Sequence, residues 1–175
     1  MEHYDIAVIG SGPGGYVAAV RSAQLGYKTV IIEKYDTLGG TCTNVGYIPT
    51  KALLDSTHHY SEARHKLKDH GISLEQVDLD FTQMYRRKTE VVSKNTAGLD
   101  FLMNKNKITR LKGTACFESN TVLKIVNDTE TVSITAENYI IATGSKPSTI
   151  PGVEIDKKRI ITSTEALSLQ EKPQS

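Results

Sequence analysis

The 175-residue sequence predicts an α/β fold with a parallel sheet, a helical insertion and a small antiparallel β excursion. Short apolar runs, typical of buried parallel strands, occur at Ile6–Ile9 and Thr29–Ile32. Between them, the Ala- and Val-rich segment Tyr16–Leu25 predicts a helix that a glycine ends. Segments 121–126 and 131–135 alternate polar and apolar residues, as antiparallel strands do. These three observations together define the fold class.

The composition indicates a soluble globular protein. Hydrophobic residues make up 38% of the chain and charged residues 23%, which argues against disorder. Lys and Arg number 21 against 20 Asp and Glu, and a net charge of +1 argues against a nucleic-acid-binding protein. No apolar run approaches the roughly 20 residues that a bilayer span requires, so we expect no membrane partner.

Location is predicted from the N-terminus and from the cysteines. Residues 1–5 lack the cationic and apolar regions of a signal peptide. Two cysteines, Cys42 and Cys116, are too few for a disulfide framework. We therefore expect a reducing compartment, with the cytoplasm as the simplest location.

The first predicted strand runs into a glycine-rich turn with the pattern G-x-G-x-x-G at Gly10, Gly12 and Gly15. The first glycine permits a tight turn, the second lets the backbone approach a pyrophosphate, and the third lets the helix pack on the strand. The helix N-terminus offers free N–H groups to phosphates. Glu33, at the end of the next strand, could accept hydrogen bonds from ribose hydroxyls and would repel a 2′-phosphate. A Rossmann-like dinucleotide-binding domain explains this order of elements better than a glycine-rich turn without a ligand.

Two helices are expected in the middle of the chain. Pro49 suits the first turn of the first helix, and the helical pattern then runs over Ala52–Lys68. The second begins near Asp80, which can cap it. The histidines of the first helix have no completing metal ligands, so we interpret them as surface residues and expect no metal site. The inward or half-inward positions predicted for the first helix are Leu53, Leu54, His58, Ala63 and Leu67. The apolar stripe predicted for the second is Phe81, Met84, Tyr85, Lys88, Val91, Val92, Asn95, Leu99 and Leu102.

The chain then returns to the sheet. Ile108–Leu111 predicts a third parallel strand, followed by Gly113 and Thr114. Tyr139–Ile141 predicts another strand, which ends in Thr-Gly and can turn beside a ligand.

The segment 38–51, LGGTCTNVGYIPTK, resembles the redox-active motif G-G-T-C-x-N-x-G-C-I-P-[ST]-K of the flavoprotein disulfide reductases, the pyridine nucleotide-disulfide oxidoreductase family. Within that family, residues 4–72 are most similar to the dihydrolipoamide dehydrogenases, and a weaker similarity extends to the end of the chain. The resemblance implies FAD as cofactor. It also implies an NAD-dependent oxidation of dihydrolipoamide by a homodimer that works with lipoyl domains of 2-oxo acid dehydrogenase complexes.

The resemblance also implies which residues contact FAD. The lysine of the motif, Lys51, would point at the isoalloxazine ring, although a solvated lysine at the start of a helix is an alternative. Backbone groups of Gly113 and Thr114 would meet the adenine. The full implied set is Gly10, Ser11, Gly12, Pro13, Gly14, Gly15, Glu33, Lys34, Gly40, Thr41, Cys42, Lys51, Gly113, Thr114, Ala142, Thr143, Gly144 and Ser145.

One residue departs from the motif, because Tyr47 stands where the family has its second redox cysteine. Cys42 remains as the single redox thiol, and thiol–disulfide exchange needs two sulfurs. The more distant Cys116 is interpreted as a small buried apolar residue rather than a substitute. Tyr47 could be an engineered change, decay in a non-functional copy, or the mark of a relative without the disulfide, such as a soluble pyridine nucleotide transhydrogenase.

The resemblance also divides the chain. Residues 1–150 are expected to form the N-terminal part of the FAD-binding domain, and residues 151–175 a linker towards an absent NAD-binding domain. A second G-x-G-x-x-G and the family's catalytic His–Glu pair are not found in the sequence, so we expect a truncated chain that is inactive alone. A non-catalytic dinucleotide-binding module is the alternative from another functional class.

Overall fold

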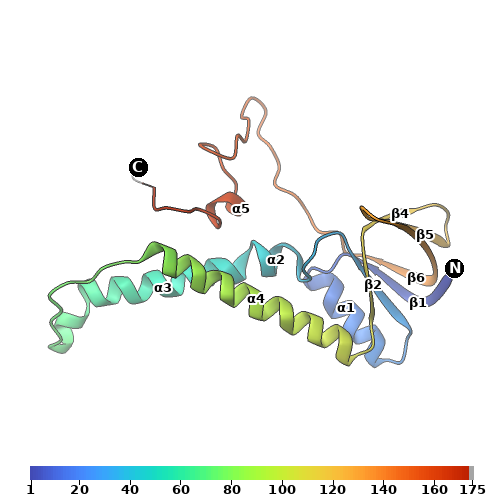
Figure 1. The fold of residues 1–175 in the computed structure, drawn as a ribbon, viewed down its shortest axis with the longest axis horizontal. Helices are drawn as coiled ribbons and strands as arrows, with labels where there is room; N and C mark the ends of the chain where they lie inside the picture. The colour runs from blue at the N-terminus through green and yellow to red at the C-terminus, as the bar shows by residue number, and fades with distance from the viewer. Residues whose placement is uncertain (174–175) are drawn as a thin grey trace. The chain divides into compact units, whose positions relative to one another are not determined.

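The computed structural model (Figure 1) describes residues 1–173 and divides into two compact units. The first unit consists of Met1–Asn44 and Asn95–Lys146. The second consists of Val45–Lys94 and the residues from Pro147 onward.

The first unit is built on one six-stranded sheet with the order β3-β2-β1-β6-β5-β4. Strand β1 pairs in parallel with β2 and with β6, and β2 pairs in parallel with β3. Strands β4, β5 and β6 pair antiparallel. The predicted α/β class with an antiparallel excursion is confirmed. The strands are β1 (Glu2–Ile9), β2 (Thr29–Glu33), β3 (Thr109–Lys112), β4 (Thr114–Phe117), β5 (Val122–Val126) and β6 (Thr131–Ile141).

Strand β6 differs from the prediction. The separate strands expected at 131–135 and 139–141 are one 11-residue strand. The residues between the two predicted segments pair with β1, through Tyr4↔Ala136 and Ile6↔Asn138. This pairing satisfies the backbone through the polar stretch, so the strand continues.

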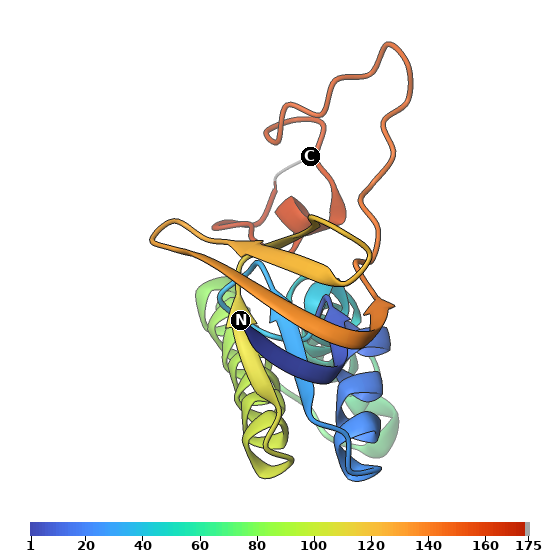
Figure 2. The ribbon, with the colours of Figure 1, turned by 90° about the vertical axis from the view of Figure 1, so that its right-hand side faces the viewer.

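Two apolar clusters form the core of the first unit. One joins β1 and β2 to helix α1 (Pro13–Gln24) and to the end of α4 (Phe81–Lys105), through Val8, Ile31, Ala19, Leu99 and Met103. The other joins the same two strands to β5 and β6, through residues such as Val30, Ile32, Leu123 and Ile134. Because side chains alternate along β2, its successive residues serve opposite clusters. Within the first unit, Figure 2 shows helix α1 on one side of the central strands and the β4–β5 strands on the other.

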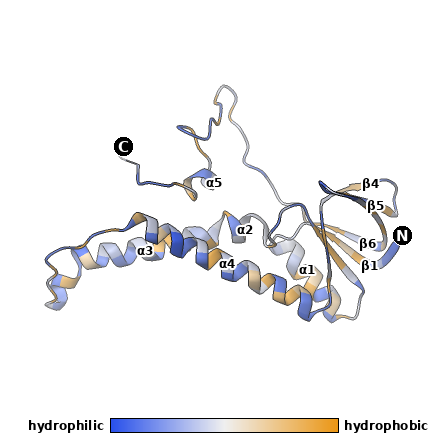
Figure 3. Cartoon of the chain, viewed as in Figure 1, coloured by the Kyte–Doolittle hydropathy of each residue, from blue (hydrophilic) through white to orange (hydrophobic). Residues whose placement is uncertain are grey.

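The second unit contains helix α3 (Tyr47–His65), the short 3₁₀ helix η1 (Leu67–His70), the first turns of α4 and the short helix α5 (Ser163–Ala166). Asp80 caps α4 as predicted, since its Oδ1 accepts from the N–H of Gln83 at 2.9 Å. Figure 3 shows polar and apolar residues alternating along α3 and α4, whereas the central strands are mostly apolar. The two helices therefore carry polar and apolar residues along their length, and β2 is the strand that is buried throughout.

Several predicted core positions are wrong. Leu54 and His58 of α3 are exposed, and Ala52 is the buried residue of that stretch. On α4, Asn95 is exposed and the adjacent Thr96 is buried. These errors are shifts of one or two positions around a helix whose period was correctly predicted.

Cys116 is also placed differently from the prediction, because its thiol is free and exposed rather than buried. It lies on β4, which pairs with β5 at the edge of the sheet. Ala115 packs against the core, so the next residue points to the opposite face. Among the residues that the structure describes, no helix combines the length and apolar character needed to cross a membrane.

Candidate dinucleotide-binding site

A cavity of about 240 Å³ lies in the first unit, where β1, β2 and β6 end. Three backbone hydrogen bonds join the turns around it: Gly10 N–H to Ile32 O at 2.8 Å, Ala142 N–H to Ile9 O at 2.8 Å, and Gly113 N–H to Glu33 O at 2.9 Å. The strand order changes direction at β1, because β2 pairs on one side of β1 and β6 on its other side. In open α/β sheets, ligands bind at this kind of switch point, beyond the carboxyl ends of the strands.

The cavity collects many of the residues predicted for FAD. Its volume is smaller than the roughly 300–1,000 Å³ typical of whole-ligand pockets, so it suits one portion of a dinucleotide. The predicted residues that line it are Gly10, Ser11, Gly12, Glu33, Lys34, Gly40, Thr41, Gly113, Thr114, Ala142, Thr143, Gly144 and Ser145.

The three glycines of the turn have different surroundings. Gly10 has a φ of +99°, and a Cβ there would lie 2.3 Å from the carbonyl oxygen of Ala142. A Cβ on Gly15 would lie 1.8 Å from the carbonyl oxygen of Gly10, so only glycine lets α1 approach the strand this closely. A Cβ on Gly12, which lines the cavity, would meet no protein atom within 4 Å. The first and third glycines therefore serve packing, and the second leaves space beside the cavity.

The start of α1 is suited to an anion. Gly12 is its N-cap residue and supplies no side-chain acceptor, and the first turn contains no acidic residue. Pro13 occupies the first helical position, where a missing N–H costs nothing. The unsatisfied N–H groups and the positive end of the helix dipole favour a phosphate there. Pro13, Gly14 and Gly15 belong to this first turn and do not line the cavity themselves.

Glu33 is buried at the end of β2, with 6% of its surface exposed. Its Oε2 accepts from the backbone N–H of Ser11 at 3.0 Å and from the Ser11 hydroxyl at 2.6 Å. Its Oε1 accepts from the N–H of Tyr35 at 3.0 Å. The carboxylate expected to meet a ribose is thus oriented by its own chain.

Sequence reasoning missed five lining residues: Ile9, Ile32, Tyr35, Ala115 and Lys146. Each directly follows or precedes a residue that was predicted, and a wider window at each strand end would have found them. Two of them add chemistry. The Lys34 ammonium lies over the ring of Tyr35, 4.9 Å from the ring centroid. Lys146 is a second lysine in the cavity lining.

The residues of the redox motif fall in both units. Cys42 is half-buried in helix α2 (Gly40–Asn44) of the first unit, its thiol is free, and it does not line the cavity. Tyr47 begins α3 in the second unit with 55% of its surface exposed, and Lys51 follows it, also exposed. Both line a surface groove of about 670 Å³ between α3 and α4.

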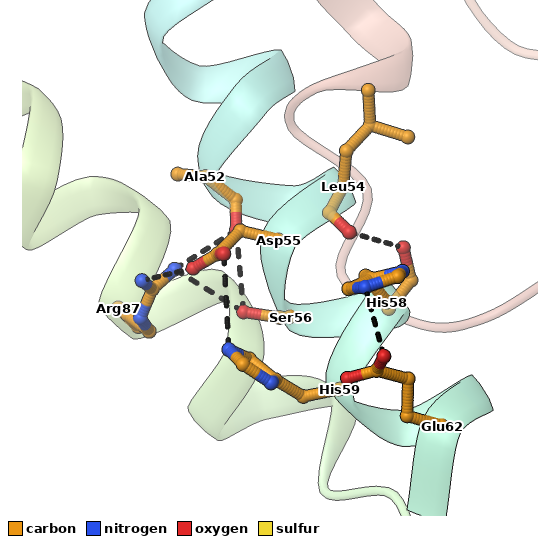
Figure 4. A network of polar contacts seen from close by, with 9 residues as sticks. Ala52, Leu54, Asp55, Ser56, His58, His59, Glu62 and Arg87 are labelled. Carbon is orange, nitrogen blue, oxygen red and sulfur yellow. Dashed lines mark hydrogen bonds and ion pairs between the residues drawn. The ribbon is translucent and has the colours of Figure 1, made fainter. Parts of the chain in front are cut away.

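Arg87 of α4 anchors a polar network beside this groove (Figure 4). Its guanidinium donates to the carbonyl of Ala52 at 2.9 Å and to the carboxylate of Asp55 at 2.7 Å. His58 pairs with Glu62 at 3.3 Å on the exposed surface of α3. Within residues 1–173, no group of three or more His, Cys, Asp or Glu side chains is placed to hold a metal ion. We interpret the network as a link between the two helices.

A parallel sheet with a G-x-G-x-x-G turn and a buried acid at its carboxyl edge defines the class of dinucleotide-binding α/β proteins. The pyridine nucleotide-disulphide oxidoreductase family matches residues 4–175, and the chain belongs to this family. FAD is the cofactor that this membership implies, and the open Gly12 and the uncapped α1 fit its pyrophosphate.

Curated relatives narrow the similarity. The mitochondrial dihydrolipoyl dehydrogenase of Schizosaccharomyces pombe is 48% identical over 172 residues, which are 97% of this chain and 34% of that protein. The corresponding protein of Pisum sativum is 47% identical over 170 residues, with the same coverage. A leghemoglobin reductase of Vigna unguiculata is 48% identical and is covered to 32%. The predicted resemblance is confirmed, and the chain spans about a third of the length of these relatives.

Solved structures agree with this placement. The Cu(II) complex of the HOCl-induced flavoprotein disulfide reductase RclA from Escherichia coli superposes with a TM-score of 0.81 at 28% identity. The match covers 98% of this chain and 35% of that one. The Rossmann-like FAD-binding fold that the sequence predicted is therefore shared with a flavoprotein disulfide reductase.

Proposed function

We propose that this chain is the FAD-binding portion of a dihydrolipoyl dehydrogenase-like oxidoreductase and that it holds the cofactor through the ADP half. The observation that carries the proposal is the cavity at the switch point, where Gly12 leaves open space and Glu33 is held at the strand end. Residues 1–150 form the N-terminal part of the FAD domain in this proposal, and residues 151–175 lead towards an NAD-binding domain. We also propose that the whole protein works in the cytoplasm, as a homodimer that acts with lipoyl domains.

Each part of the cavity has its own task in this proposal. The N–H groups at the start of α1 hold the pyrophosphate, and Lys34 and Lys146 balance its charge from the lining. Glu33 accepts from the ribose hydroxyls, and the backbone at Gly113 and Thr114 borders the adenine. FAD, when bound, supplies the hydride-accepting chemistry that protein side chains lack.

Tyr47 limits what the chain can do with a dithiol. Oxidation of dihydrolipoamide through a protein disulfide needs two sulfurs that exchange, and a phenol cannot take that part. We therefore propose that the chain alone does not oxidise dihydrolipoamide. Tyr47 also favours a second candidate, a portion of a disulfide-free relative such as a soluble pyridine nucleotide transhydrogenase.

Gel filtration of the purified chain with FAD tests the cofactor proposal. We expect the visible flavin absorption to co-elute with the protein and to be displaced by excess ADP, since both ligands share the cavity. A folded protein that elutes colourless from saturating FAD and leaves ADP unbound would contradict it and favour a module with another ligand.

The substitution Tyr47→Cys tests the dithiol proposal, best made in a Cys116→Ser background. We expect the free-thiol count after mild oxidation to fall by two in the Tyr47→Cys protein, because the family's motif pairs these two positions. The same chain with Tyr47 intact should keep its Cys42 thiol. If both proteins keep every thiol, the segment does not form the family's disulfide, and the disulfide-free candidate is preferred.

A further inference from the structure

Ser11 is a fully buried polar residue inside the glycine turn, with 0% of its surface exposed. Its hydroxyl donates to Glu33 Oε2 at 2.6 Å and accepts from the N–H of Gly39 at 3.1 Å. Its carbonyl oxygen accepts from the same Gly39 N–H at 3.0 Å. One side chain thus links three segments that are distant in sequence: the glycine turn, the end of β2 and the loop before α2.

The hydrogen bonds leave the two oxygens of Glu33 in different states. Oε2 accepts two hydrogen bonds, both from Ser11. Oε1 accepts one, from the N–H of Tyr35. Since each carboxylate oxygen has about two acceptor positions, Oε2 is filled and Oε1 retains one position.

We infer that Ser11 is a positioning residue, which fixes the Glu33 carboxylate so that Oε1 is the oxygen left for a ribose hydroxyl. This inference rests on the proposed function, because it needs an adenine nucleotide in the cavity. Ser11 lines the same cavity. It acts through Glu33, because its hydroxyl already donates its hydrogen bond to the carboxylate.

The chemistry of position 11 is specific. Alanine and glycine lack the hydroxyl and leave Oε2 with only the backbone donor. Threonine keeps the hydroxyl but adds a methyl group at a site without free surface. Hydrogen bonds to a charged group are stronger than those between neutral groups, so the loss of one loosens the carboxylate noticeably.

Amide hydrogen exchange of the ligand-free chain tests the positioning directly. The N–H of Tyr35 is held by Glu33 Oε1 and does not touch Ser11, so it reports the carboxylate. We expect Ser11→Ala to accelerate exchange at Tyr35 by about tenfold, which corresponds to one such hydrogen bond. Ser22→Ala is the matched control, because it removes the hydroxyl of a second buried serine, one that lies on α1. It should leave the exchange rate at Tyr35 unchanged. Unchanged exchange at Tyr35 in Ser11→Ala overturns the inference.

Calorimetric titration with ADP and 2′-deoxy-ADP tests the selectivity. The wild type is expected to prefer ADP, and Ser11→Ala to lose about tenfold in that preference. Ser11→Ala combined with Glu33→Gln should behave like Glu33→Gln alone, because the serine acts only through the carboxylate. Additive losses overturn the inference. If no protein, wild type included, binds ADP, the proposed function and the selectivity both fail, while exchange at Tyr35 still decides the positioning.

Discussion

Gly12 and Gly15 belong to one turn but face different neighbours, and this difference can be measured. A Cβ on Gly15 would overlap the backbone of Gly10 at 1.8 Å. We expect Gly15→Ala to destabilise the first unit by about 1–3 kcal/mol or more, as overpacking does. Urea unfolding followed by circular dichroism measures the change.

Gly12→Ala is the matched variant, because its φ of −64° suits alanine and its Cβ would meet no protein atom. We expect the unfolding free energy to fall by no more than about 1 kcal/mol, because alanine is a poorer N-cap than glycine. FAD binding should weaken, since the methyl group enters the space beside the cavity. If the Gly12→Ala protein binds FAD with wild-type affinity, Gly12 does not border the bound ligand.

At the same scale, the sequence predicted which residues line the cavity better than it predicted their contacts. Gly10, Gly12 and Glu33 were found because a motif and a strand end fix their positions locally. The bonds between Ser11 and Glu33 join residues 22 positions apart. No local pattern encodes such a pair, so only the folded chain reveals it.

At the scale of elements, α5 depends on a capping box. The carboxylate of Glu165 accepts from the N–H of Thr162 at 2.8 Å and from its hydroxyl, and these bonds lower the pKa of Glu165 below its ordinary value of 4.5. A lowered pKa means that the stabilisation is complete above about pH 4.5 and is lost as the pH falls through the folded-state value. We expect the protection of the amides in residues 163–167, measured as exchange relative to the intrinsic rate at each pH, to fall on acidification from pH 7 to pH 3. Glu165→Gln should exchange faster at pH 7 and respond less to pH; an equal response would assign the effect to another group.

The far end of α5 is held by α4. The hydroxyl of Tyr85 donates to the carbonyl of Ala166 at 3.0 Å, and the Lys88 ammonium donates to the carbonyl of Leu167 at 2.8 Å. Burial raises the pKa of Tyr85 and lowers that of Lys88. These carbonyls lie where a helix leaves its acceptors unpaired, so the two side chains complete the helix end.

Tyr85→Phe should therefore weaken the attachment of α5 by about 0.5–1.5 kcal/mol. Trypsin cleavage among Lys157, Lys158 and Arg159, just before the helix, should become faster. Tyr60→Phe is the control, because the Tyr60 hydroxyl accepts a hydrogen bond from exposed Arg64 rather than bonding to α5. Equal cleavage of both variants would show that the Tyr85 bond does not hold the helix.

At the scale of the first unit, the sheet is stabilised from both faces through β2. Ile31 is fully buried against the helices, while its neighbours Val30 and Ile32 serve the opposite cluster. We expect Ile31→Ala to lower the unfolding free energy by about 2–5 kcal/mol, because it leaves a cavity in a packed core. Denaturant unfolding measures this, with Ile150→Ala, 69% exposed, expected within about 0.5 kcal/mol of wild type. A small effect at Ile31 would mean that the helices do not brace this face.

The sequence by itself determined the α/β class, the glycine turn, the acid at the end of β2, the cap at Asp80 and the family. Each of these depends on residues close together in the chain, where spacing alone fixes the geometry. Only the tertiary structure decided that β6 is continuous, that Cys116 is exposed on an edge strand, and that Ser11 holds Glu33. These features arise from pairing and packing between distant segments, and the free energy of such contacts is not encoded in any local pattern.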